Sequence, residues 1–128
     1  MNIVIKATNM ELTEAIKDYA NKRAMSLEKL LGNDSGILVE VELGKDTNHH
    51  KQGEMYRAEI NVSGAGQTYR AVASSIDIYA SIDEVRDEIE RKVTNSRDRS
   101  RSLFRRGARS VKKMLKGISK RNPFTSKY

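Results

Sequence analysis

Positive charge is the feature of this sequence that most directly indicates a chemistry, and it is unevenly distributed. Residues 96–128 hold 12 Lys and Arg and a single acid, Asp98, which gives a net charge of +11. Residues 1–95 hold 12 Lys and Arg against 16 Asp and Glu, which gives a net charge of −4. Basic arms commonly bind nucleic acid, because they neutralise backbone phosphates. The sequence therefore predicts a polyanionic partner, bound largely through the C-terminal tail, residues 96–128.

Arginine dominates the first half of this tail. Its planar guanidinium group binds phosphate in a bidentate manner, which favours nucleic acid over a merely basic surface. If the tail is helical it is also amphipathic, and a basic amphipathic helix can lie on an anionic membrane. Membrane binding is therefore the rival interpretation, although we expect RNA. The candidate RNA-binding residues of the tail are Arg97, Arg99, Arg101, Arg105 and Arg106.

A second group of candidate cations lies on the first predicted helix. Lys22 and Lys29 are one heptad apart and share a side of that helix. Arg23 falls close to the apolar stripe, and two interpretations of it are open. Its aliphatic stem can cover the core while the guanidinium reaches water. Alternatively, the guanidinium is held at the surface, ready for bidentate contact with a phosphate.

The second predicted helix mixes basic residues with acids. Intrahelical ion pairs, such as Glu88 with Lys92 four residues later, are the simplest interpretation. This face is then a weak phosphate binder by itself, although Arg91 and Lys92 remain candidates. Three tyrosines could stack on RNA bases, but their strand and helix positions predict half-buried side chains. They are Tyr56, Tyr69 and Tyr79.

No catalytic constellation is present in the sequence. The absence of cysteine excludes disulfides, thiolate nucleophiles and thiolate zinc sites. The two histidines, His49 and His50, are adjacent in a polar loop and lack the spacing of zinc ligands. There is no Gly-x-x-x-x-Gly-Lys or Gly-x-Ser-x-Gly motif. We therefore expect no enzyme activity, no cofactor, no metal and no small-molecule substrate.

The elements that must position the cations follow from apolar periodicity. Thr13 fits the N-cap of a first helix that extends to Leu31, and Ser74 or Ser75 can cap a second helix. Gly64-Ala65-Gly66 fits a hairpin turn. The four strands are expected at residues 2–8, 37–43, 56–63 and 67–73. The helical stripes that face the core are Ile16, Ala20, Ala24, Leu27 and Leu31, then Ile78, Ile82, Val85, Ile89 and Val93.

This order, β-α-β-β-β-α, predicts an α+β two-layer sandwich. One four-stranded, mostly antiparallel sheet should hold two helices on one face. Residues 1–95 form this domain, and the tail either extends the second helix or forms another helix after a break. The N-terminus lacks the pattern of a signal peptide, and no apolar run approaches the ~20 residues that span a bilayer. We therefore expect a cytoplasmic protein.

Several segments of the chain match a known family in order and spacing. The chain resembles the ribosome hibernation promoting factors, also called ribosome-associated inhibitors or ribosomal subunit interface proteins, over about residues 1–95. The matching segments are Asn9-Met10-Glu11-Leu12-Thr13-Glu14-Ala15-Ile16, Leu27-Glu28-Lys29, Asp77-Ile78-Tyr79-Ala80-Ser81-Ile82-Asp83 and Ile89-Glu90-Arg91.

The resemblance implies a double-stranded-RNA-binding-like fold and a partner, the small ribosomal subunit with its rRNA. It implies docking over the mRNA and tRNA sites, which blocks translation in stressed or resting cells. The family's basic surface maps to Lys22, Arg23, Lys29, Arg91 and Lys92, with Lys17 nearby. We also expect a monomer.

Two positions depart from the family pattern, because Ser26 and Glu88 stand where members often have Lys. The tail also differs from the family tails, so it can supply charge that residues 1–95 lack. A general RNA-binding module and a regulatory protein-binding module are the alternative functions.

Overall fold

The computed structural model describes residues 1–46, 53–64 and 66–98. The chain divides into two compact units, Met1–Thr94 and Asn95–Tyr128. Of the second unit, only residues 95–98 are described, and they are helical. The first unit contains β1 (Asn2–Thr8), α1 (Glu14–Met25), α2 (Glu28–Leu31), β2 (Leu38–Asp46), β3 (Met55–Gly64) and β4 (Gln67–Ser75). A long helix, residues 78–98, follows β4.

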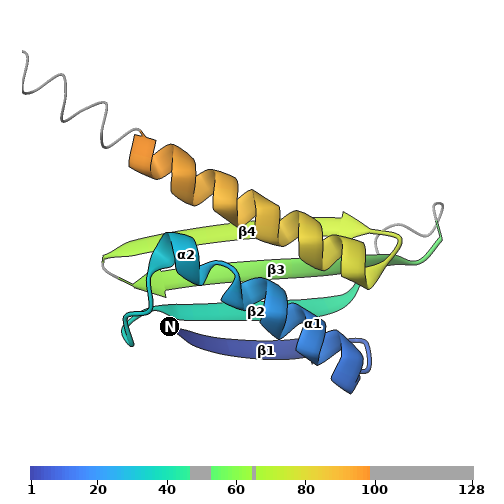
Figure 1. Cartoon of the computed structure of the whole chain (residues 1–128). Coiled ribbons are helices and arrows are strands. Elements are labelled where there is room, and N and C mark those ends of the chain that lie inside the picture. The colour runs from blue at the N-terminus through green and yellow to red at the C-terminus, as the bar shows by residue number, and fades with distance from the viewer. Residues whose placement is uncertain (47–52, 65, 99–128) are drawn as a thin grey trace, which may run out of the picture. The chain divides into compact units, whose positions relative to one another are not determined.

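The four strands form one sheet in the order β1-β2-β3-β4. β1 pairs with β2 in parallel, whereas the β2–β3 and β3–β4 pairs are antiparallel. The β3–β4 hairpin closes with Gly64 opposite Gln67, and Gly66 takes the positive φ of 74° that glycine permits. All helices lie on one face of the sheet (Figure 1). The predicted α+β fold is therefore confirmed.

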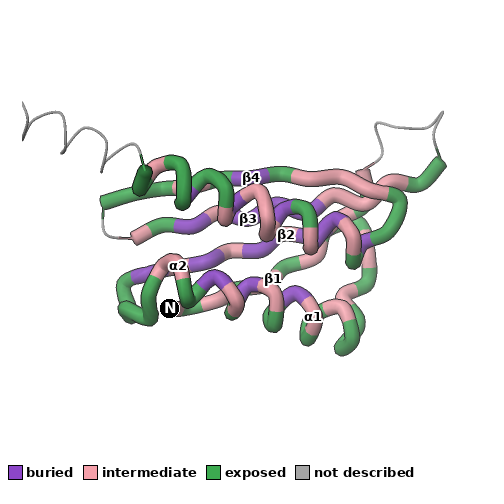
Figure 2. The backbone as a smooth tube through the Cα atoms, turned by 45° about the horizontal axis from the view of Figure 1, so that its top comes forward, coloured by how far each residue is buried: buried purple, intermediate pink, exposed green. Residues whose placement is uncertain are grey.

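The core lies between the sheet and the helices, and Figure 2 shows buried residues recurring along the strands and the helices. Both predicted helical stripes and the alternating residues of the strands form one apolar cluster. Complete burial of a Leu or Ile side chain stabilises a fold by ~1.5–3 kcal/mol, so this cluster fixes how the helices lie on the sheet. The large side chains with less than 2% exposure include Leu27, Leu43, Ile60, Ile82 and Ile89.

The start of α1 agrees with the sequence, whereas the start of the long helix does not. Thr13 is the N-cap of α1, and its hydroxyl accepts a hydrogen bond from the Ile16 N–H. The predicted cap at Ser74 or Ser75 is wrong, because β4 extends to Ser75. The Asp77 carboxylate instead accepts from the Tyr79 N–H, which is the ordinary geometry of a helix cap.

The first helix is also interrupted, although its apolar spacing predicted one helix to Leu31. α1 ends at Met25, and Leu27 N–H bonds to the carbonyl of Ala24, only three residues earlier. The Ser26 hydroxyl donates to the carbonyl of Arg23 and so competes with the helical ladder. The heptad argument that placed Lys22 and Lys29 on one side of a continuous helix therefore does not hold.

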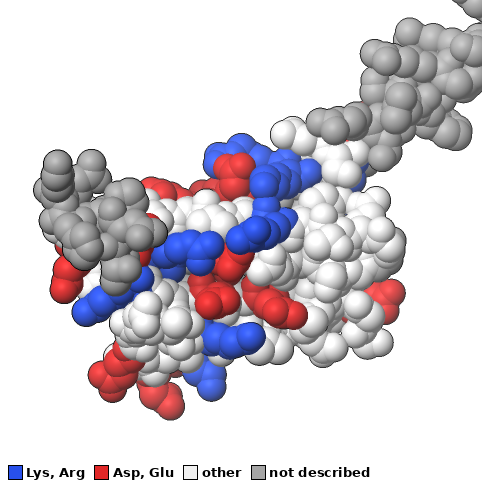
Figure 3. All heavy atoms as spheres, turned by 180° about the vertical axis from the view of Figure 1, so that it is seen from behind, with Lys and Arg blue, Asp and Glu red and all other residues white. Residues whose placement is uncertain are grey.

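The opposite face of the sheet presents mixed charge. Viewed from behind, one half of this face shows basic and acidic side chains intermixed, and the other half is mostly uncharged (Figure 3). The side chain of Glu59 is only 10% exposed, because ion pairs with Arg57 and Arg70 cover it. Neighbouring Glu42 accepts a hydrogen bond from Thr8. The two arginines therefore neutralise Glu59 locally and are not available as a separate basic surface.

Some predictions fall outside the described residues. The polar loop with His49 and His50 and the tail beyond residue 98 are among them, so the choice between one extended helix and two stays open. The proposed domain roles of residues 1–95 and 96–128 also stay predictions. In the part of the chain that the structure describes, no helix combines the length and the apolar character needed to cross a bilayer.

Candidate nucleic-acid interface

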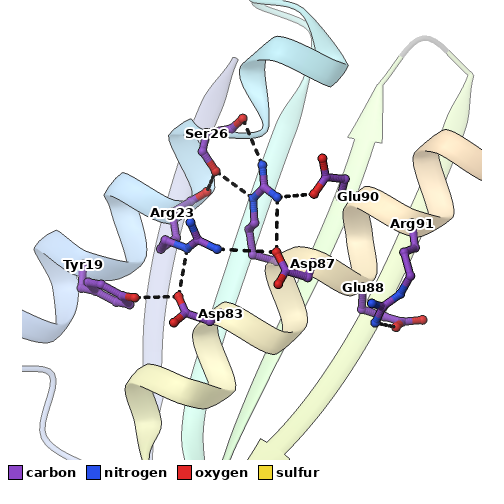
Figure 4. A network of polar contacts seen from close by, with 9 residues as sticks. Tyr19, Arg23, Ser26, Asp83, Asp87, Glu88, Glu90 and Arg91 are labelled. Carbon is purple, nitrogen blue, oxygen red and sulfur yellow. Dashed lines mark hydrogen bonds and ion pairs between the residues drawn. The ribbon is translucent and has the colours of Figure 1, made fainter.

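The end of α1 and the middle of the long helix meet in a group of polar side chains, shown in Figure 4. We call this group the interhelical cluster; its members are Tyr19, Arg23, Ser26, Asp83, Arg86, Asp87 and Glu90. It brings together residues about 60 positions apart in the sequence, such as Ser26 and Arg86. Because it lies where the predicted basic surface was expected, it decides which cations are available to a ligand.

Arg23 bridges the two helices. Its Nε lies 2.9 Å from Oδ1 of Asp83, and its Nη2 lies 3.5 Å from Oδ1 of Asp87. The Nε atom is buried and makes no hydrogen bond of acceptable geometry, so its contact with Asp83 is one of charge. The side chain is 32% exposed. Arg23 therefore neither extends freely into water nor presents an unoccupied guanidinium to phosphate.

Asp83 is itself held in place by Tyr19. The Tyr19 hydroxyl donates to Oδ1 of Asp83 over 2.6 Å. This hydrogen bond, with burial and the charge of Asp83 adding to it, raises the pKa of Tyr19 above its ordinary value of 10.0. The carboxylate that faces Arg23 is thus oriented from the α1 side as well as from its own helix.

Arg86 is the most buried cation of the cluster, with a side chain 13% exposed. Its Nε donates to the Ser26 hydroxyl over 2.8 Å, and Nη2 lies 3.5 Å from the Ser26 carbonyl. Nη1 contacts Glu90 closely and lies 3.3 Å from Oδ1 of Asp87. Ser26, which departs from the family pattern, therefore anchors an arginine. The pair of Arg86 with Glu90 is an intrahelical ion pair of the kind predicted for this helix, whereas the contact with Ser26 was not predicted.

The remaining basic residues of the long helix are also engaged. Glu88 pairs with Arg91, three residues later, and not with Lys92 as predicted. The hydrogen bond between them lowers the pKa of Glu88 and raises the pKa of Arg91. The Lys92 ammonium instead donates to the main-chain carbonyl of Arg70 on β4. Arg91 and Lys92 are exposed, so both cations can still exchange their present partners for a phosphate.

The lysines of the first two helices differ from these arginines. Lys17, Lys22 and Lys29 are exposed, and none has an ion pair within the described residues. Arg97 is exposed near the end of the described helix. Arg99, Arg101, Arg105 and Arg106 lie outside the described residues. Of the predicted RNA-binding residues in the folded part, Lys22 and Lys29 are therefore the most accessible.

The helical layer as a whole is nearly neutral. The described parts of α1, α2 and the long helix contain eight basic and nine acidic residues. Ion pairing further reduces the positive potential that RNA would meet. The basic surface that the family resemblance implied is consequently thin on this layer.

The tyrosines differ in exposure. Tyr56 and Tyr69 are half-buried against the core, as predicted. Tyr79 is 36% exposed, and its ring meets that of Tyr19 edge-on at a centroid distance of 5.1 Å.

Among the residues that the structure describes, no three His, Cys, Asp or Glu side chains are grouped as metal ligands would be.

The sequence and the fold both have known relatives. The model of the family described as Sigma 54 modulation protein / S30EA ribosomal protein matches residues 3–101. The ribosome hibernation promotion factor of Picosynechococcus sp. is 29% identical over 101 residues, which are 78% of this chain and 51% of the relative. The ribosome hibernation promoting factor of Escherichia coli (strain K12) is 27% identical over 104 residues, 77% of this chain and 96% of the relative.

Solved structures agree with these matches. The crystal structure of the Thermus thermophilus Protein Y N-terminal domain is 31% identical, with a TM-score of 0.61, over 74% of this chain and 98% of that one. A ribosomal subunit interface protein from Coxiella burnetii is 16% identical, also with a TM-score of 0.61, over 77% and 99% of the two chains, and it supports the fold alone. The chain spans about half the length of three curated relatives, at 51%, 43% and 49%.

Proposed function

Because the chain belongs to the Sigma 54 modulation protein / S30EA ribosomal protein family, we propose that it docks on the small ribosomal subunit over the mRNA and tRNA sites and holds ribosomes inactive. The membership confirms the resemblance recognised in the sequence. The match over residues 3–101 is the observation that carries the proposal. Relatives at 27% and 29% identity are named ribosome hibernation factors. The family is not known as one of enzymes.

Within this proposal, the ligand is the phosphate backbone of rRNA. Lys22 and Lys29 contact it directly, because their ammonium groups are exposed and unpaired in the described structure. The tail, with 12 cations and one acid, contributes most of the favourable charge, since residues 1–95 have a net charge of −4. The protein acts as a cytoplasmic monomer, and its tail binds RNA rather than membrane.

Co-sedimentation with ribosomal particles tests the proposal. The protein should run with small subunits and whole ribosomes in a sucrose gradient at low salt, and tRNA should displace it. A double variant, Lys22→Gln with Lys29→Gln, should bind more weakly without a change in melting temperature. Recovery of the protein only in the ribosome-free fraction would refute the proposal.

A general RNA-binding function is the second candidate, and the near-neutral helical layer favours it. If binding depends on the tail alone, the contacts are to phosphates and are independent of sequence. An unrelated RNA would then compete with small subunits for the protein as effectively as rRNA does. Selective retention by the small subunit in the presence of excess unrelated RNA would exclude this candidate.

A further inference from the structure

We propose that Arg23 and Arg86 form a binding position for one RNA backbone phosphate, and that the Asp87 carboxylate occupies this position in the free protein. The inference rests on the proposed binding to rRNA. It assigns a ligand-competing role to an acid of the interhelical cluster. It also adds Arg86, which the sequence did not indicate, to the candidate RNA-binding residues.

Asp87 is the most loosely held acid of the cluster. Its Oδ1 lies between the two guanidinium groups, 3.5 Å from Nη2 of Arg23 and 3.3 Å from Nη1 of Arg86. Both distances exceed those of an ideal charged hydrogen bond, about 2.7–2.9 Å. Its side chain is also 50% exposed, more than that of Asp83 or Glu90. Asp87 can therefore rotate into water at little cost.

The two arginines keep their places when Asp87 leaves. Arg86 remains bonded to the Ser26 hydroxyl over 2.8 Å and to Glu90. Arg23 remains against Asp83, which the Tyr19 hydroxyl holds from the other side. The vacated position thus presents two guanidinium groups whose orientation is already fixed, so little side-chain entropy is lost when a ligand binds.

The chemistry of the position suits a phosphodiester. The Asp87 oxygen now accepts a hydrogen bond from Nη1 of Arg86 and forms an ion pair with Nη2 of Arg23. A single non-bridging phosphate oxygen in the same place can accept from both Nη atoms, and arginine is suited to phosphate. With Asp87 in place, the two arginines face three carboxylates, so the local charge is −1. Without the charge of Asp87, the two arginines balance Asp83 and Glu90, and an entering phosphate meets a neutral rather than an anionic surface.

Removal of the Asp87 charge should therefore tighten RNA binding. In the full chain, Asp87→Asn should raise the affinity for isolated small ribosomal subunits about two- to fivefold, the range of an exposed ion pair. Glu84→Gln is the matched control, because Glu84 is exposed on the same helix and has no ion pair within the described residues. This substitution also removes one negative charge, but at a site away from the two arginines. It should therefore raise the affinity for small subunits by less than Asp87→Asn does.

A variant of Arg23 shows whether the gain depends on the arginine. In a protein that already contains Arg23→Gln, Asp87→Asn should raise the affinity for small subunits no more than Glu84→Gln does. Melting temperatures of all variants verify that the fold persists. Equal gains from Asp87→Asn and Glu84→Gln, or an undiminished excess without Arg23, would overturn the inference.

A titration with inorganic phosphate separates this inference from the proposed function. In an NMR experiment, the Nε–H signals of Arg23 and Arg86 should shift at lower phosphate concentration in Asp87→Asn than in the unaltered chain or Glu84→Gln. If no form of the chain binds small subunits, the proposed function fails, and this titration decides the inference. Identical titration curves in the three proteins would then refute it.

Discussion

Two sets of cations on the same helical layer differ in what surrounds them. Arg23 and Arg86 lie between the helices, where Asp83, Asp87 and Glu90 neutralise them. Lys22 and Lys29 lie on the exposed side, with no ion pair in the described structure. Arginine is the better phosphate ligand by geometry, yet here the lysines are the accessible ones. The presence of a basic residue near a predicted surface therefore does not establish that its charge is available.

The same contrast extends to the two parts of the sequence. Residues 1–95 contain enough acids to pair with every cation, whereas residues 96–128 contain 12 cations and only Asp98. A segment with a single acid offers its own cations few carboxylates that could compete with RNA phosphates. The comparison thus predicts that binding affinity depends more on the tail than on the helices.

Deletion of the tail should have the largest effect on binding. Each phosphate contact contributes about −0.7 to −0.9 to the slope of log K against log salt concentration. If half of the 12 tail cations make contacts, truncation after Asn95 should flatten this slope by about four to five units. The folded unit should persist, because the apolar stripe ends at Val93. Ribosome binding at several salt concentrations measures the effect.

An unchanged slope after truncation would reverse the comparison, because the helical layer would then provide the docking surface by itself. Vesicles of anionic lipid provide the control for a membrane role. If the tail binds such vesicles and its removal leaves the affinity for ribosomes unchanged, the tail is a membrane arm instead.

Arg86 should affect stability more than any exposed cation. Arg86→Met keeps the aliphatic stem but removes the contacts to Ser26 and leaves Glu90 without its partner. Loss of hydrogen bonds by a largely buried charged group should lower the free energy of unfolding by about 1–3 kcal/mol. Arg91→Met is the matched control, because Arg91 is 64% exposed and has one partner, Glu88. Chemical denaturation should show a clear loss of stability for Arg86→Met and almost none for Arg91→Met. Equal losses would contradict the distinction between the buried and the exposed arginine.

The fold was largely predictable because periodicity encodes it. Ile3 and Ile5 on one face of β1, and the spacing from Ile78 to Val93, directly reflect which surfaces the core buries. The cap at Asp77 was missed because Ser74 and Ser75 are equally good cap residues, and only the length of β4 excludes them. The break after Met25 was missed because Leu27 keeps the helical spacing even though the backbone tightens there.

The pairing of the candidate site was not predictable, since it depends on contacts between distant segments. Arg23 and Asp83 are 60 residues apart, and nothing in their local sequences links them. The resemblance located the basic positions, but it did not show that the acids of the long helix face them. Asp83 and Asp87 reach Arg23 because both helices pack on the same face of the sheet.

The smallest predicted effect concerns Tyr19, which orients the acid that holds Arg23. Its hydroxyl donates to Asp83, and this bond raises the pKa of Tyr19. A raised pKa in the folded state means that the stabilisation is complete below the unfolded value of about 10 and is lost as the pH rises through the folded value. Tyr19→Phe should therefore cost about 0.5–1 kcal/mol near neutral pH, and the difference from the unaltered protein should narrow above about pH 10.

Denaturation at a series of pH values measures this difference, and the other tyrosines cancel because both proteins contain them. Asp83→Asn provides the second arm of the test. Without the Asp83 carboxylate, the hydroxyl of Tyr19 has no anion to donate to, so Tyr19→Phe should have a smaller effect that no longer varies with pH. Equal stability of the two proteins from about pH 7 to about pH 11 in the presence of Asp83 would show that Tyr19 stabilises the helices through its ring alone, because phenylalanine keeps the ring. Asp83 would then hold Arg23 without help from the Tyr19 hydroxyl, and the paired arginines would be less rigidly positioned than their distances suggest.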